Sequence, residues 1–150
     1  MMTKLILGPL VGGLADTQAY LWARADGPAT LHAWLGQQPD LSDAALAGTF
    51  ELPAENGFAG IAPLNDLIPE TQYFYTLTLD ASPPAPTAEA YPAFTTFPVD
   101  GEIRSFSFAF GSCFLPQHEN GGEIFNHLNQ LRLCKLLHKD LYFPVWLGSP

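Results

Sequence analysis

Apolar and polar positions alternate along much of the first hundred residues. In the segment 17–25, Ala19, Leu21 and Ala23 share one parity, and residues 71–80 alternate in the same way with aromatic and leucine side chains. A period of two is typical of a β-strand that buries one face. Turn residues separate these short segments, which favours a small antiparallel sandwich. Strands are expected near the start of the chain and at residues 17–25, 29–37, 48–52, 57–64, 71–80 and 90–98.

The period of the pattern changes about two-thirds of the way along the chain. Residues 102–111 alternate as a strand, whereas residues 120–139 repeat apolar side chains every three or four positions, as a helix does. Residues 140–148 are apolar like a buried strand. Strand, helix and strand in this order predict a βαβ unit, which normally implies a parallel sheet. The predicted domains are a β-sandwich over residues 1–100 and a βαβ unit over residues 101–150, so the fold class is mainly β.

One run of the first part carries a family resemblance. Residues 67–75 read Leu-x-Pro-x-Thr-x-Tyr-x-Tyr, which resembles the start of a late strand in fibronectin type III domains. In that family the tyrosine packs at a corner between the two sheets. The resemblance implies a fibronectin III or immunoglobulin-like antiparallel β-sandwich.

Composition and charge narrow the classes of partner. Hydrophobic residues make up 47% of the chain and charged residues 14%, as in a globular protein. The formal net charge of −9 disfavours nucleic acid and anionic membrane surfaces, because their phosphates would be repelled. Eleven acids and two bases, Lys4 and Arg24, lie in residues 1–100, against four of each in residues 101–150. No apolar run reaches the roughly 18 residues of a membrane helix, and the start is a poor signal peptide, so a cytoplasmic location is expected.

Cys113 is the first candidate for chemistry. It follows the strand 102–111, at the edge of a parallel sheet where loops gather ligand-binding groups. A thiolate there could bind a metal or act as a nucleophile, and the alternative is a buried, inert thiol. Ser112 lacks the Gly-x-Ser-x-Gly pattern of a nucleophile elbow. His118 is either a spatial neighbour of this thiol or a solvated loop histidine.

A second group of candidates lies on the predicted helix. Cys134 and His138 are four positions apart, so they share a helix face and could share a metal. Two ligands do not complete a site, and Cys134 also fits the buried stripe of the helix. His127 can likewise be a structural residue of the helix and not a ligand.

The second part of the chain resembles a known enzyme family. The runs "SFSFAFGSC" (105–113), "IFNHL" (124–128) and "DLYF" with "WLG" (140–148) resemble the PhoD-like alkaline phosphatase D metallophosphoesterases. Members begin with a small fibronectin-like domain, which an α/β metallophosphatase domain follows, and they are often exported. The resemblance implies metal-dependent hydrolysis of phosphate esters, with iron and calcium as cofactors. It also implies that Cys113 corresponds to an iron ligand.

The end of the sequence departs from that family. The next family strand ends in Leu-Gly-Asp, whose Asp bridges the metals, whereas here Ser149 follows Leu147 and Gly148. A neutral hydroxyl cannot replace a bridging carboxylate. Pro144 also interrupts the expected central strand. We therefore expect a truncated βαβ unit that binds no metal stably and hydrolyses no phosphate ester by itself.

Three functional hypotheses remain open at this point. The chain is the front part of a PhoD-like phosphatase, or a non-catalytic β-sandwich binding module, or a thiol enzyme that uses Cys113 with His118 or His127. In the second hypothesis the acidic β-sandwich packs against a partner, and another polypeptide that carries the rest of the fold is one such partner.

Overall fold

The structure is a computed structural model that describes residues 3–103. Met1–Glu102 form one compact unit. The predicted βαβ unit lies outside the described residues, so the division into domains 1–100 and 101–150 stays a prediction. The elements of the described part are β1 (Leu5–Gly12), β2 (Ala19–Ala25), β3 (Ala29–Gly36), β4 (Ala45–Leu52), the short 3-10 helix η1 (Ala54–Asn56), β5 (Ala59–Leu64), β6 (Gln72–Thr78) and β7 (Ala93–Thr95).

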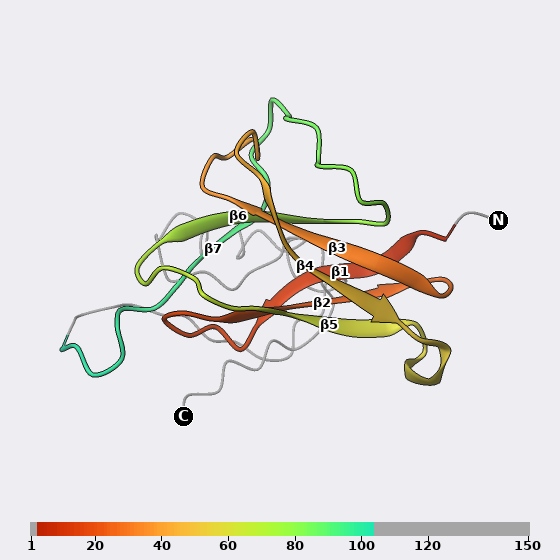
Figure 1. Ribbon diagram of the computed structural model, residues 1–150, viewed down its shortest axis with the longest axis horizontal. Helices are drawn as coiled ribbons and strands as arrows, with labels where there is room; N and C mark the ends of the chain where they lie inside the picture. Colours follow the sequence, from red (N-terminus) through yellow and green to blue (C-terminus); the bar gives the residue numbers. More distant parts are fainter. Residues whose placement is uncertain (1–2, 104–150) are drawn as a thin grey trace, which may run out of the picture. The chain divides into compact units, whose positions relative to one another are not determined.

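The strands form two antiparallel sheets. One sheet has the order β1-β2-β5 and the other the order β4-β3-β6-β7. Figure 1 shows them as two layers, and we call them the three-stranded and the four-stranded sheet. The predicted mainly β fold, an antiparallel sandwich, is confirmed for the described residues.

Most strands lie where the alternation predicts them, and the largest difference is at β7. The sequence predicts a strand over residues 90–98, but only Ala93–Thr95 pair with β6. Pro92 and Pro98 lie on either side of this short strand. Proline has no backbone N–H to donate to a neighbouring strand, so prolines on both sides favour a short edge strand.

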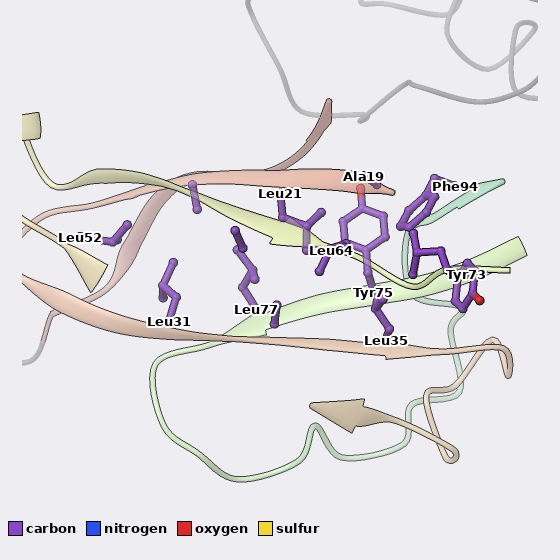
Figure 2. Packing of buried hydrophobic residues seen from close by; sticks show 14 of the residues in the cluster. Ala19, Leu21, Leu31, Leu35, Leu52, Leu64, Tyr73, Tyr75, Leu77 and Phe94 are labelled. Carbon is purple, nitrogen blue, oxygen red and sulfur yellow. The ribbon is translucent and has the colours of Figure 1, made fainter. Parts of the chain in front are cut away.

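The core lies between the two sheets. Leu21 of β2 and Leu64 of β5 project from one sheet, and Leu31 of β3 and Leu77 of β6 project from the other (Figure 2). Each of these leucines is at most 7% exposed. Burial of such a side chain contributes about 1.5–3 kcal/mol, so this layer holds the two sheets together.

A tyrosine corner closes one end of the sandwich, as the fibronectin resemblance implies. The Tyr73 hydroxyl accepts a hydrogen bond from the backbone N–H of Ile68 at 3.0 Å. The buried Thr96 hydroxyl donates to the Ile68 carbonyl at 2.6 Å and accepts from the Thr71 N–H at 2.9 Å. The Phe94 ring lies 5.8 Å from the Tyr73 ring, centroid to centroid. These contacts fix the segment that leads into β6.

Candidate interaction surface

The outer face of the three-stranded sheet carries a row of apolar side chains. Ala19, Leu21 and Ala23 of β2 point into the core, so the alternate residues of β2 point outward. Among these outward residues, Trp22 pairs with Leu10 of β1 on one side and with Ile61 of β5 on the other. One apolar row therefore crosses all three strands.

A second row lies beside the first. Tyr20 pairs with Gly12 of β1 and with Pro63 of β5. A Cβ atom at Gly13 would overlap the Tyr20 ring, so this ring lies directly against the glycine backbone. We call the outward residues of the two rows the apolar face: Leu10, Tyr20, Trp22, Ile61 and Pro63.

The apolar face is open to solvent in the described part of the chain. Ile61 is 58% exposed and Tyr20 is 36% exposed, and Leu10 and Trp22 are half-buried. Cross-strand neighbours lie about 4.5–5.5 Å apart at their Cβ atoms, so these side chains form one continuous patch. Large contiguous apolar patches on soluble proteins often mark contact sites.

Gly8 helps to position the β1 side of this face. The strand changes register between Leu7 and Leu10, and Gly8 lies in that interval with a φ of +91°. A Cβ at this position would lie 2.7 Å from the carbonyl oxygen of Trp22. A glycine is therefore required here for β1 to approach β2 and carry Leu10 beside Trp22.

One end of the apolar face carries both signs of charge. Lys4 and Arg24 are the two Lys or Arg residues within residues 3–103, and both lie where β1 begins and β2 ends. The Arg24 Nε donates to the Gly57 carbonyl at 3.0 Å, and the Lys4 N–H donates to the Asp26 carboxylate at 2.9 Å. With Asp26 and Glu55 of η1, the formal charge of this end is zero.

The opposite end is acidic. Asp16 lies in the turn between β1 and β2, and its carboxylate accepts from the backbone N–H of Asp100 at 3.3 Å. Asp66 follows β5, and the next residue donates its N–H to the Thr17 carbonyl at 2.9 Å. At least three carboxylates and no Lys or Arg therefore lie at this end in the described part of the chain, so its formal charge is negative.

The outer face of the four-stranded sheet is different. Polar side chains bond to one another across its strands, with the Thr30 hydroxyl 2.8 Å from the Glu51 carboxylate and the Thr49 hydroxyl 3.4 Å from the His32 ring. Of the large apolar residues on this side, Trp34 and Phe74 are only 6% and 9% exposed, whereas Leu46, which pairs with Trp34, is 49% exposed. The accessible apolar surface on this side therefore lies at the edge strand β4 and does not cross the sheet as the row on the other sheet does.

A connection covers the apolar part of the four-stranded sheet. A Cβ at Gly36 would lie 3.1 Å from the Leu41 side chain, and Gly36 pairs with Phe74. Leu41 is 2% exposed, so the loop between β3 and β4 folds back over the sheet. The Tyr91 N–H donates to the Pro39 carbonyl at 2.8 Å, which holds the β6–β7 connection beside that loop (Figure 1).

The chemical sites expected from the sequence lie elsewhere in the chain. Cys113 and Ser149 lie outside the described residues, as do the weaker candidates Ser112, His118, His127, Cys134 and His138, so the structure does not test them. Within residues 3–103, no group of three or more His, Cys, Asp or Glu side chains could hold a metal ion. In the same residues, no helix is long and apolar enough to cross a membrane.

The sequence pattern contained the signal for the apolar face, but the functional hypotheses did not use it. Tyr20, Trp22 and Arg24 occupy the parity of β2 that faces away from the core. Two aromatic side chains on that parity are unusual, because the solvated face of an antiparallel sheet is commonly polar. Pairing between strands far apart in sequence then adds Leu10 and Ile61 to them.

Comparisons with known proteins give one family and several distant structures. PhoD is 14% identical with a TM-score of 0.48, and the match covers 62% of this chain and 19% of PhoD, about a fifth of its length. The longer form of the sensor domain of the anti-sigma factor RsgI4 from Pseudobacteroides cellulosolvens is 16% identical with a TM-score of 0.46, and the match covers 71% of this chain and all of that domain. The solution structure of the same sensor domain is 13% identical with a TM-score of 0.46, and the match covers 79% and 98% of the two chains.

None of the curated proteins compared with the chain matches it. A family model does match, over residues 2–97, which is more than half of the chain and nearly all of the described sandwich. The chain therefore belongs to the family described as "Domain of unknown function (DUF7800)".

Proposed function

We propose that residues 3–103 act as a non-catalytic β-sandwich interaction module whose contact surface is the apolar face. The observation that supports this proposal is the row Leu10, Trp22 and Ile61, which crosses the three-stranded sheet with Ile61 58% exposed. A partner that covers such a row removes apolar surface from water at a gain of about 25 cal/mol per Å². An exposed apolar row does not stabilise the isolated sandwich.

Site-specific photocrosslinking in the native host tests this proposal. Ile61→p-benzoylphenylalanine places a photoreactive group at the centre of the apolar face, and Thr49→p-benzoylphenylalanine places it on the polar outer face of the other sheet. We expect a discrete covalent protein adduct from position 61 and none from position 49. Equal adducts from both positions, or none from either, would contradict a specific contact surface.

A second candidate function rests on the sequence run 105–113. We propose that the chain contributes the front part of a PhoD-like metal-dependent phosphoesterase, with Cys113 as an iron ligand. In a complete relative, iron and calcium would polarise the phosphate ester and generate a hydroxide nucleophile. Ser149 stands where that family places a bridging carboxylate, so this chain is expected to lack turnover by itself.

This second candidate has its own test. The purified chain is incubated with p-nitrophenyl phosphate and with its diester analogue, in the presence of iron and calcium. We expect no hydrolysis above the metal-only control and no iron that stays bound to the chain through gel filtration. Turnover by the purified chain would contradict the expected lack of activity, and stably bound iron that survives Cys113→Ser would rule out the proposed role of the thiol.

A further inference from the structure

We propose that the connection between β6 and β7 is a ligand for a second protein, one whose groove is lined with aromatic side chains and binds polyproline II helices. The inference goes beyond the apolar face, because it rests on another part of the sandwich. Residues 79–92 join two neighbouring antiparallel strands and contain four prolines, at positions 83, 84, 86 and 92. Two residues suffice to join such strands, and irregular connections longer than about 12 residues are commonly functional.

The sequence of residues 82–86 holds this run in the polyproline II conformation. Proline fixes φ near −65°, and a residue that precedes proline is kept extended, which applies to Ser82, Pro83 and Ala85. The peptide bonds before the three prolines of the run are trans, and no residue of the connection has a positive φ. A polyproline II segment has no internal hydrogen bonds. Within the described part of the chain the carbonyls of these three prolines accept no hydrogen bond, so they are available to a partner.

The run presents one side to solvent. A polyproline II helix has three residues per turn and a rise of about 3.1 Å per residue, so Pro83 and Pro86 lie on the same side, about 9 Å apart. Both prolines are exposed, whereas Pro84, on another side of the helix, is half-buried. Segments with prolines three positions apart dock in aromatic-lined grooves, as WW and Src-homology-3 domains show. The exposed side of the run therefore has the spacing that such a groove binds.

Hydrogen bonds hold the run in place. The Tyr91 hydroxyl donates to the Ala85 carbonyl at 2.9 Å, and the Tyr91 backbone N–H donates to the Pro39 carbonyl at 2.8 Å. Before the run, the Asp80 carboxylate accepts the Ser82 N–H at 2.9 Å. Figure 1 shows the connection as a green arch that rises from the sandwich. A segment that is already held in its bound conformation loses less conformational entropy when it binds.

The charge beside the run narrows the class of partner. Asp80 and Glu89 lie on either side of it, and Asp40 follows Pro39 in the loop to which the connection is bonded. The two Lys or Arg residues within residues 3–103 lie on the other sheet, at β1 and β2. A groove rimmed by Lys or Arg fits this arch, whereas an acidic rim is repelled. One short segment buries little area, so the expected dissociation constant is between about 10 µM and 1 mM.

Binding of the labelled full chain to an array of purified WW and Src-homology-3 domains tests the proposal. We expect binding to the domains with basic groove rims, and the double variant Pro83→Ala/Pro86→Ala should weaken it about tenfold or more. The matched control Pro92→Ala removes a proline of the same connection outside the run and should leave binding unchanged. Circular dichroism should show the same fold for both variants. Binding to no domain of the array, or binding that survives the double variant, would overturn the proposal.

A synthetic peptide of residues 81–90 provides a test that does not depend on folding. The peptide should compete with the full chain for the same domains, but about threefold more weakly, because it lacks the hydrogen bond from Tyr91. Tyr91→Phe should lower the affinity of the full chain toward that of the peptide. A peptide that fails to compete, or one that competes equally well with alanine in place of Pro83 and Pro86, would overturn the proposal.

A variant of the apolar face separates this inference from the proposed interaction module. Ile61→Asp alters that face and should leave binding to the array unchanged, because position 61 lies on the other sheet. The photocrosslinking at position 61 and the array therefore fail independently of each other. Loss of array binding in a folded Ile61→Asp chain would overturn the assignment of the binding site to the β6–β7 connection.

Discussion

Trp22 and Trp34 occupy equivalent outward positions on the two sheets, but their surroundings differ. Trp34 of β3 is 6% exposed, and its indole N–H donates to the Thr78 hydroxyl at 2.9 Å. Trp22 of β2 is half-buried, and within residues 3–103 its indole N–H has no hydrogen-bond partner. One tryptophan is built into the fold, whereas the other lies on a surface that the fold leaves open.

The loops beside the two sheets, and not the strands, cause this difference in exposure. The loop between β3 and β4 carries Leu41 back over the four-stranded sheet, and that residue is 2% exposed. The β1–β2 turn carries no such cover over the three-stranded sheet: its Gly13 lies under the Tyr20 ring and leaves the ring 36% exposed. An outward aromatic residue therefore indicates a contact site only where no loop folds over it.

Removal of the two tryptophans is expected to give the largest contrast. Trp34→Ala should lower the free energy of unfolding by about 3–5 kcal/mol, because it leaves a cavity and removes the bond to Thr78. Trp22→Ala should cost less than about 1.5 kcal/mol, because Trp22 is only half-buried and its removal gives up less buried apolar surface. Urea denaturation followed by circular dichroism measures both. Similar costs at the two positions would show that the two outer faces do not differ as described.

Loss of the loop cover should expose the four-stranded sheet. Leu41→Ala removes a buried side chain and is expected to cost about 2–4 kcal/mol. The Trp34 emission should shift to longer wavelength as water reaches the ring, and a background with both Trp22→Phe and Trp146→Phe leaves Trp34 as the one tryptophan of the chain. An unchanged emission maximum together with full destabilisation would mean that another segment covers Trp34.

Substitution of Ile61, an exposed residue of the apolar face, should change the stability less. Ile61→Thr should change the free energy of unfolding by no more than about 0.5 kcal/mol, because the side chain is 58% exposed and threonine suits a strand. The reciprocal variant Thr49→Ile adds an apolar group to the outer face of the other sheet and should also change the free energy of unfolding by no more than about 0.5 kcal/mol. A large stability loss at Ile61 would make its row part of the core.

Local patterns predicted the strands but not the surface that they create. The alternation at Ala19, Leu21 and Ala23 identified the buried side of β2, because burial is a local parity along a strand. The apolar face also needs Leu10 and Ile61, and their positions beside Trp22 depend on pairing registers that include irregularities in β1. A sequence pattern within one strand does not contain such registers.

The tyrosine corner shows the same limit of local patterns. The run 67–75 predicted the tyrosine corner, because the lead-in residues and Tyr73 are close in sequence and bond locally. The partner that closes this corner, Thr96, lies 25 residues after Thr71 and carries no local signal. The local motif therefore predicted the position of the corner and its tyrosine, whereas the hydrogen bonds of Thr96 depend on tertiary pairing.

The burial of Tyr75 between the two sheets should make the stability of the fold depend on pH. Tyr75 points across the core toward Ala19 (Figure 2) and is 4% exposed, so burial raises the pKa of its hydroxyl above the usual value of about 10. The unfolded chain releases this proton near pH 10, whereas the folded chain retains it. The contribution to stability is complete below about pH 10 and is lost as the pH rises further.

Tyr75→Phe should remove that pH dependence while changing stability little at neutral pH. Within residues 3–103 the hydroxyl makes no hydrogen bond, so its removal leaves no buried partner unsatisfied. At pH 11 the variant should be more stable than the parent chain by about 1 kcal/mol, because one more proton is bound in the folded than in the unfolded parent. Urea titrations at pH 7 and pH 11 measure the difference, and Tyr20→Phe on the exposed face is the matched control. If both variants gained equally at pH 11, the effect would belong to tyrosine ionisation in general and not to the closed space between the sheets.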